Sequence, residues 1–279
     1  PGARLAAVDH PNESATEIEA LWRGAQKPSH KFLHYFPTYE HLFHRYRSTD
    51  FTFVEFGVQG GGSLQMWRSY FGDQARIIGV DLNPVAKDEN PDFEVFIGDQ
   101  GDREFLDFLF RQIGHYDAVL DDGGHQSFQQ ILTVERALAN AEGPVVVAVE
   151  DTVTSFYPDF RMFHRRRSFH RFAHALADAI TRRNLAPGVT TPPYDAVWRV
   201  EFCGGIVAFH ADPQQVRLDR RRSEFNTDVA PALGDFRYVG KSSAAVNWPT
   251  PRGSRKVTVH GQPGWIPAYP IPRRWRQRG

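Results

Sequence analysis

Cysteine is almost absent from this sequence, and long hydrophobic runs are missing. The single cysteine among 279 residues, Cys203, cannot form a disulfide within the chain and has no metal-ligand spacing around it. No apolar stretch approaches the roughly 20 residues that cross a bilayer, and the first residues lack the basic-then-apolar order of a signal peptide. The sequence therefore predicts a soluble, cytoplasmic protein without a membrane span.

An excess of either charge is also absent. Thirty-three basic residues balance thirty-three acidic ones, so no overall field would hold the protein on nucleic acid or on an anionic membrane. With 41% hydrophobic and 24% charged residues, the chain is long enough for one large α/β domain with a buried core, plus appendages. We expect a small or neutral substrate and no nucleic-acid partner.

The central part of the sequence alternates short β-rich runs with helical spacing. The runs lie at residues 51–57, 75–81, 93–99, 116–122 and 144–151, and helices are expected from Ser63, Asp102 and Ser127. This alternation predicts a parallel, doubly wound α/β sheet. Residues 77–80 and 145–149 are apolar at consecutive positions, which predicts strands in the sheet centre that helices cover on both faces.

The flanking segments divide the chain into three predicted parts. Residues 1–48 are expected to form a helical lid over the mouth of the sheet, with breaks at Pro28 and Pro37. Residues 49–211 form the core. Residues 212–279 are rich in Pro, Gly, Trp and Arg without clear periodicity, and we expect an irregular extension that is an arm, a dimer contact or partly disordered.

Two further elements are expected near the end of the core. Apolar residues at helical spacing between Phe169 and Ile180 predict an amphipathic helix, whose basic face is either solvated or an anion site. Residues 196–201 and 205–210 are expected to form a closing antiparallel pair of strands. Gly204 and Gly205 between them indicate a bend or bulge.

A glycine-rich turn from Gly57 to Gly62 follows the first predicted strand and leads into a helix that Ser63 can cap. Such a turn lets a ligand approach the backbone. A nicotinamide fingerprint would need glycine at position 59, where this chain has Gln59. Glu55 stands instead where methyltransferases carry an acidic residue that fixes the amino acid end of their cofactor.

Polar residues also end the next three predicted strands, at the edge where open α/β sheets bind ligands. Asp81 can accept both ribose hydroxyls of a nucleoside, which favours an adenosine cofactor. Asp99 and Gln100 suit an adenine edge, or equally cap the helix that begins near Asp102. The predicted cofactor-binding residues are Glu55, Gly57, Ser63, Asp81, Asp99, Gln100 and Asp121.

Carboxylates gather at the ends of the fourth and fifth predicted strands. Because adjacent strands lie roughly 4.8 Å apart, Asp122, Glu150 and Asp151 can meet around one ion. An all-oxygen set favours a hard cation, Mg²⁺ first and then Mn²⁺ or Ca²⁺. Taken alone, each of these acidic residues is also a candidate to cap the helix that follows it. His125, three residues after Asp122, is either a general base or a surface histidine.

These motifs resemble the metal-dependent sugar O-methyltransferases of macrolide and cell-envelope polysaccharide biosynthesis. The similarity covers about residues 30 to 160 and rests on EFGVQGGGSLQMWRSYFG, IIGVDLNP, FIGDQGD, VLDDGGH and VVVAVEDT, with HKFLHYFPTYEHLF before them. It implies a class I methyltransferase fold with a mostly parallel seven-stranded sheet, S-adenosylmethionine as cofactor, Mg²⁺ on Asp122, Glu150 and Asp151, and His125 as general base. Gly124 stands where such proteins often have Ser.

The resemblance implies a carbohydrate acceptor, and a mannose- or glucose-containing oligosaccharide of a methylated polysaccharide is the substrate we expect. The alternatives are an antibiotic deoxysugar, a rhamnosyl lipid or a catechol. An oxidoreductase and a non-catalytic Rossmann-like binding module are the rivals from other classes. A homodimer is expected from the resemblance. Tyr35, Phe36, Tyr39 and Tyr157 are candidates to stack on sugar faces.

Overall fold

A seven-stranded sheet organises the computed structural model, which describes residues 16–160, 168–183, 189–219, 255–259 and 262–266. Its strand order is β3-β2-β1-β4-β5-β7-β6. Strands β1 to β5 are parallel, and β7 runs antiparallel to both of its neighbours. The strands are β1 (Thr52–Phe56), β2 (Arg76–Asp81), β3 (Glu94–Ile97), β4 (Ala118–Asp121), β5 (Val145–Val149), β6 (Val197–Cys203) and β7 (Ile206–Ala211).

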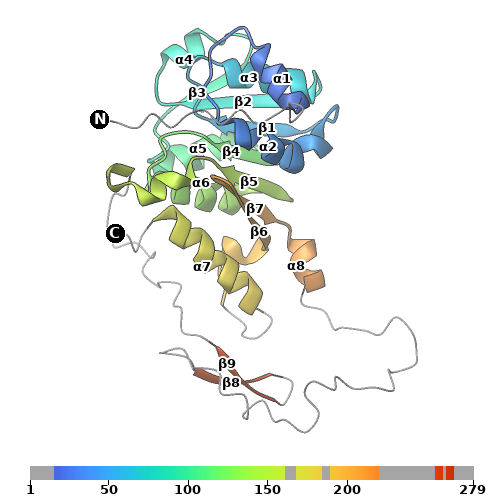
Figure 1. Ribbon diagram of the computed structural model, residues 1–279, viewed down its shortest axis with the longest axis vertical. Coiled ribbons are helices and arrows are strands. Elements are labelled where there is room, and N and C mark those ends of the chain that lie inside the picture. The colour runs from blue at the N-terminus through green and yellow to red at the C-terminus, as the bar shows by residue number, and fades with distance from the viewer. Residues whose placement is uncertain (1–15, 161–167, 184–188, 220–254, 260–261, 267–279) are drawn as a thin grey trace, which may run out of the picture.

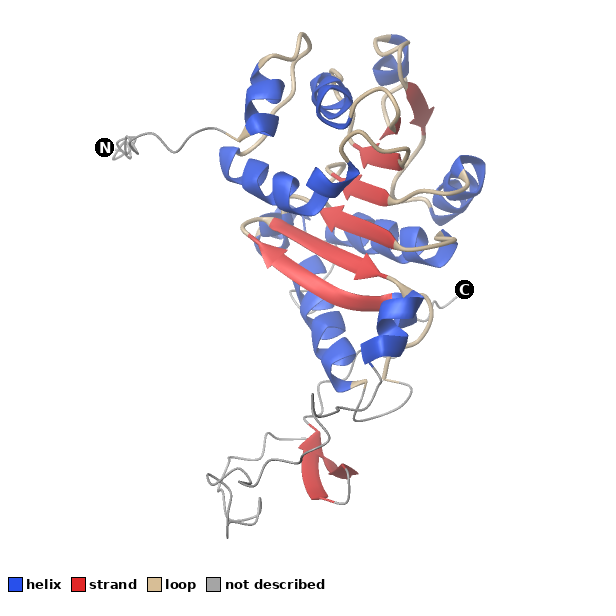
Figure 2. Ribbon diagram, turned by 90° about the vertical axis from the view of Figure 1, so that its right-hand side faces the viewer, coloured by secondary structure: helices blue, strands red, loops and turns tan. Residues whose placement is uncertain are grey.

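Helices pack on both faces of this sheet (Figures 1 and 2). The α-helices are α1 (Glu17–Arg23), α2 (Phe36–Phe43), α3 (Gly62–Phe71), α4 (Val85–Asp88), α5 (Arg103–Ile113), α6 (Ser127–Asn140), α7 (Phe169–Arg182) and α8 (Pro213–Asp219). The 3₁₀ helices are η1 (Leu33–Tyr35), η2 (His44–Tyr46), η3 (Thr152–Phe156), η4 (Pro158–Phe160) and η6 (Tyr194–Ala196). This is the doubly wound, mostly parallel seven-stranded architecture that the sequence predicts. None of the described helices is long and apolar enough to cross a membrane.

The two faces of the sheet carry different cores. One core joins α2 and α3 to β1 and is rich in aromatic rings, with Trp67 stacked on Phe71 at 5.2 Å. The other joins α5, α6 and α7 to the opposite face and includes Phe110, Phe169 and Phe209. All residues of β1 and β5 are buried because helices cover both of their sides. The sheet is therefore a rigid platform whose carboxyl edge carries the polar residues.

The expected secondary structure is largely confirmed, with local corrections. The helix after the glycine-rich turn begins at Gly62, and its N-cap is Gly61, so Ser63 does not cap it. Asp102 does cap α5, through hydrogen bonds from the backbone of residues 104 and 105. Pro37 lies in the first turn of α2, where a missing amide hydrogen costs nothing, so it starts a helix and does not break one.

The closing strand pair is also confirmed. Gly204 and Gly205 form a tight turn between β6 and β7, with Gly205 at φ 87°, and the register shift lies at the other end of the pair, between Val197 and Arg199. Strand β2 is buried on both faces but stands next to the edge strand β3, so it is less central than expected. Of the predicted extension 212–279, the described parts are α8 and an antiparallel pair, β8 (Arg255–Val259) with β9 (Gln262–Ile266). The rest of that extension, and residues 1–15 of the predicted lid, lie outside the described residues.

The buried ring of Phe209 tests the second core. Phe209→Ala removes a fully buried side chain in β7 that contacts Phe169 and Phe172, and should lower the free energy of unfolding by about 3–5 kcal/mol. Phe108→Ala, at a ring 49% exposed on α5, is the matched control and should change it by less than about 0.5 kcal/mol. Urea unfolding followed by circular dichroism measures both. Equal losses would contradict the assignment of the core.

Candidate active site

A pocket of about 230 Å³ opens at the carboxyl edge of the sheet, between β1 and β4. The chain proceeds from β1 toward β3 on one side and from β4 toward β5 on the other, so the pocket lies at the switch point where such sheets bind ligands. The ends of four parallel strands and the loops after them line it, together with one residue of α6. They are Phe56, Gly57, Gln59, Val80, Asp81, Leu82, Gly98, Asp99, Gln100, Asp122, Gly123, Gly124 and Gln129.

The glycines of the turn after β1 serve two different purposes. Gly57 adopts φ 91°, and a Cβ there would collide with the backbone of Asp122, so β1 and β4 approach closely at the pocket. A side chain at Gly60 or Gly62 would collide with Pro28 or the carbonyl of Lys27. That part of the turn is therefore covered by the protein's own N-terminal segment, and the ligand-accessible part is the stretch from Gly57 to Gln59.

Two of the predicted cofactor residues face the pocket with their carboxylates. Asp81 accepts hydrogen bonds from the backbone nitrogens of Val58 and Gln59, each at 2.9 Å, so it also fixes the turn after β1. Asp99 is exposed and accepts one hydrogen bond, from the backbone of Gly101 at 2.7 Å. The alternative that Asp99 or Gln100 caps α5 is wrong, since Asp102 is the N-cap of that helix.

The side chain of Gln100 is directed behind the pocket. Its amide nitrogen donates to Asp121 Oδ1 at 2.6 Å and to Thr133 Oγ1 at 2.9 Å, and its oxygen accepts from the backbone of Gly124 at 3.0 Å. Asp121 is fully buried, and burial raises the pKa of its carboxyl. Gln100 and Asp121 therefore hold the loop from Asp122 to His125, and Gln100 also lines the pocket.

Glu55 and Ser63 form a buried pair beneath the turn. The Ser63 hydroxyl donates to Glu55 Oε2 at 2.8 Å, and the Trp67 indole donates to Oε1 at 3.1 Å. Both polar side chains are buried, and neither lines the pocket. Burial raises the pKa of Glu55 to about 7.

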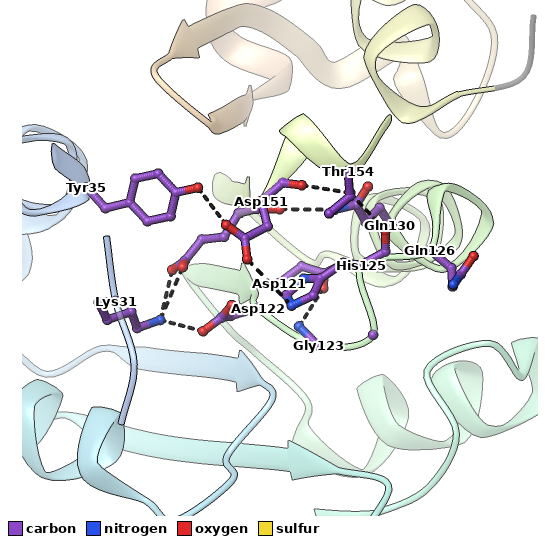
Figure 3. A network of polar contacts seen from close by, with 12 residues as sticks. Lys31, Tyr35, Asp121, Asp122, Gly123, His125, Gln126, Gln130, Asp151 and Thr154 are labelled. Atoms are coloured by element: carbon purple, nitrogen blue, oxygen red, sulfur yellow. Dashed lines mark hydrogen bonds and ion pairs between the residues drawn. The ribbon is translucent and has the colours of Figure 1, made fainter. Parts of the chain in front are cut away.

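Lys31 places an ammonium among three carboxylates, a feature that the sequence analysis does not anticipate. Its Nζ donates to Asp122 Oδ2 at 2.6 Å (Figure 3). It also donates to both oxygens of Glu150 at 3.1 and 3.2 Å, and lies 3.8 Å from Glu55 Oε1. The side chain is 1% exposed. Burial opposes its charge, but Asp122 and Glu150 outweigh that cost and raise the pKa of Lys31 well above its ordinary value.

Three of the four predicted metal and base residues form one partly exposed cluster, and the fourth lies apart from it. Asp122, His125 and Asp151 each offer one ligand atom within 4.8 Å of the others, and each is partly exposed. His125 Nε2 lies 3.6 Å from Asp151 Oδ2, and both residues adopt left-handed backbone conformations, with φ of 55° and 51° (Figure 3). Such strain in residues other than glycine persists where the surroundings enforce it, and it concentrates at functional sites.

Glu150 is the fourth residue and lies deeper in the protein. It is 1% exposed, and burial followed by the charge of Asp122 raises the pKa of its carboxyl. Tyr39 donates to Glu150 Oε1 at 2.6 Å, and Tyr35 donates to Asp151 Oδ1 at the same distance.

The expectation that Tyr35, Phe36 and Tyr39 stack on sugar faces is wrong. Their rings are 2%, 0% and 0% exposed. Among the four candidate aromatics only Tyr157 presents a ring to solvent, at 51% exposure.

Known proteins share this arrangement of motifs. The chain is 33% identical over 141 residues to mycinamicin VI 2''-O-methyltransferase of Micromonospora griseorubida, a match that covers 48% of this chain and 35% of that protein. It is 34% identical over 135 residues to the 8-demethyl-8-(2-methoxy-α-L-rhamnosyl)-tetracenomycin-C 3'-O-methyltransferase of Streptomyces olivaceus, covering 46% and 34%. The matched region thus spans about a third of the length of each relative. No protein-family model matches the chain.

Solved structures agree on the fold. The methyltransferase MycE of the mycinamycin biosynthetic pathway, in complex with Mg, S-adenosylhomocysteine and mycinamycin VI, superposes with a TM-score of 0.63 at 24% identity, covering 71% of this chain and 54% of that one. The class I methyltransferase fold that the motifs imply is confirmed. The resemblance to sugar O-methyltransferases is confirmed as well, because both relatives are O-methyltransferases and the second acts on a rhamnosyl tetracenomycin.

The buried amide of Gln100 generates a first prediction for the site. Gln100→Leu removes one of the two donors to Asp121 Oδ1 and the acceptor of the Gly124 amide, and should lower the free energy of unfolding by about 1–3 kcal/mol. Gln112→Leu, on the exposed side of α5, should change it by less than about 0.5 kcal/mol. Urea titration of both variants makes the comparison. An unaltered Gln100→Leu protein would show that the amide does not hold this loop.

The raised pKa of Glu55 leads to a second prediction for the site. Between pH 4.5 and 7 the folded protein keeps a proton on this carboxyl that the unfolded chain releases, so the free energy of unfolding falls as pH rises through that window. Wild type should therefore lose about 2–3 kcal/mol relative to Glu55→Gln between pH 5 and pH 7.5, measured by urea unfolding in a chelator. Glu142→Gln, at an exposed position, serves as the control. A pH-independent difference between wild type and Glu55→Gln would contradict the assignment.

Proposed function

We propose that this chain carries the catalytic core of an S-adenosylmethionine-dependent, divalent-metal-dependent O-methyltransferase that acts on a sugar hydroxyl. The observation that carries this proposal is the position of Asp122. It lines the pocket together with Asp81 and Asp99, and it belongs to the cluster with His125 and Asp151. A methyl donor in the pocket and an acceptor at the cluster would therefore lie on either side of Asp122.

In this proposal the pocket binds the cofactor. Asp81 accepts the ribose hydroxyls, Asp99 faces the adenine, and the backbone near Gly57 admits the ligand closely. The Glu55, Ser63, Gln100 and Asp121 side chains keep a supporting role, because their described hydrogen bonds join them to the protein beneath the pocket. S-adenosylmethionine supplies the electrophilic methyl group when bound.

The carboxylate cluster fits a hard divalent cation. Glu55, Asp122 and Glu150 lie near one ammonium, that of Lys31, and Asp151 belongs to the neighbouring cluster with Asp122, so the group has an excess of negative charge when ionised. Carboxylate oxygens are the ligands that Mg²⁺ prefers, with Mn²⁺ or Ca²⁺ as substitutes. Asp122, Glu150 and Asp151 would hold the ion, and its charge would favour the alkoxide form of a neighbouring hydroxyl.

His125 is proposed as the general base. Its ring is partly exposed, and its Nε2 lies 3.6 Å from Asp151 Oδ2 beside Asp122, where the acceptor is proposed to bind. His125 would take the proton of the acceptor hydroxyl, and the bound cofactor would supply the methyl group to that oxygen, its sulfonium sulfur leaving as a neutral thioether. The structure also allows His125 a place among the metal ligands, which a variant distinguishes from the role of base.

The acceptor we propose is a hydroxyl of an antibiotic deoxysugar. The relatives' names refer to glycosylated macrolides and tetracenomycins, and none of them states a polysaccharide. The expected mannose- or glucose-containing oligosaccharide has no support among them. A helical lid formed by residues 1–48, an interface role for residues 212–279, a homodimer and a cytoplasmic location remain parts of the same proposal.

The test follows S-adenosylhomocysteine release from S-adenosylmethionine, with demethylated macrolide and rhamnosyl glycosides as acceptors and with or without Mg²⁺. Turnover should need an acceptor and the ion. His125→Ala should lower kcat by about 10² to 10⁴ while the Mn²⁺ affinity stays unchanged. His44→Ala, an exposed histidine on η2, is the matched control and should turn over like wild type.

Each alternative has its own result in that assay. A weaker Mn²⁺ affinity in His125→Ala would make this histidine a ligand. Turnover that is confined to catechols would replace the sugar acceptor. A chain that binds no S-adenosylmethionine would contradict the enzyme assignment and favour a binding module.

A further inference from the structure

The segment Gln26–Tyr35 crosses the carboxyl edge of the sheet and touches both halves of the site. At one end, the backbone nitrogens of Gln26 and Lys27 donate to Gln65 Oε1 on α3 at 2.8 and 3.0 Å. At the other end, Tyr35 donates to Asp151. Lys31 stands midway between these contacts, with its ammonium on Asp122 and Glu150 (Figure 3).

The contacts of Lys31 coincide with those that a metal ion needs. Asp122 and Glu150 are two of the three proposed metal ligands, and the ammonium lies 2.6 to 3.2 Å from their oxygens. An ion that binds the same oxygens would lie about 2.0–2.1 Å from them if it is Mg²⁺. The two cations would then occupy overlapping space and repel each other.

We propose that Lys31 is a built-in competitor of the divalent ion: the ion displaces its ammonium from Asp122 and Glu150 and thereby loosens the segment Gln26–Tyr35. This inference rests on the proposed metal site. It assigns Lys31 the role of setting the metal affinity. A cation tethered in the chain keeps the buried carboxylates paired until the ion arrives, because leaving such charges unpaired is costly.

A different position of the ion would leave Lys31 largely in place. An ion held by Asp122, His125 and Asp151 would compete with Lys31 at Asp122 alone and would leave its ammonium on Glu150. The segment would then keep its contact with Glu150, and its amide exchange would not speed up when the ion binds.

The experiment compares Lys31→Met with Lys27→Met by Mn²⁺ titration, followed by electron paramagnetic resonance without cofactor or acceptor. Methionine is unbranched and one atom shorter than lysine, so it keeps most of the side chain and removes the charge. Lys27 lies on the same segment, but its ammonium contacts the Glu89 carbonyl and Asn90 and does not contact a carboxylate. Lys31→Met should bind Mn²⁺ about tenfold or more tightly than wild type, and Lys27→Met like wild type. Unchanged or weaker binding in Lys31→Met would overturn the inference.

Hydrogen exchange on the wild-type chain tests the inference without a variant, in case Lys31→Met fails to fold. Saturating Mg²⁺ should speed amide exchange in peptides from Gln26–Tyr35 and leave α7 unchanged. Unchanged or slower exchange in that segment would overturn the inference. A wild-type chain that binds neither ion would reject the proposed metal site itself, whereas ion binding without an effect of Lys31→Met rejects the competition alone.

Discussion

Repulsion among acidic side chains is the constraint on which the site depends. Parallel strands end at one edge of the sheet, and β1, β4 and β5 bring Glu55, Asp122 and Glu150 together there. The buried ammonium of Lys31 offsets part of that repulsion. Because Lys31 comes from the segment before β1, the same ion contacts hold that segment over the carboxyl edge. The negative charge that one ammonium leaves uncompensated is what a divalent cation would neutralise.

The loop after β4 links the two halves of the site. Asp122 and Gly123 line the pocket, Asp122 and His125 belong to the cluster, and Gln100 holds the loop from behind. Left-handed conformations at His125 and Asp151 direct their side chains toward each other across the ends of β4 and β5. Shifts of this loop would therefore alter the pocket and the cluster together, which suits a reaction between a donor and an acceptor held side by side.

The sequence alone predicts the sheet and the edge that carries the polar residues, because strand periodicity and chain order determine both. Asp81, Asp122 and His125 follow from the same reasoning, since each lies at the end of a strand or in the loop after it. Side-chain direction is not encoded in that pattern. Gln100 follows β3 and lines the pocket, yet its amide is hydrogen-bonded to Asp121 and Thr133, and Glu150 lies deeper than its neighbour Asp151. Lys31 is a single lysine in an aromatic segment outside any strand pattern, so its pairing appears only in three dimensions.

In the proposed enzyme, one site holds an adenosyl cofactor and a divalent ion on either side of Asp122. Diffraction from crystals grown with S-adenosylhomocysteine and Mn²⁺, recorded at the manganese absorption edge, tests it most directly. The account predicts ribose density at Asp81 and an anomalous peak in contact with Asp122 and Asp151. A pocket without the nucleoside, or an anomalous peak away from these carboxylates, would contradict it.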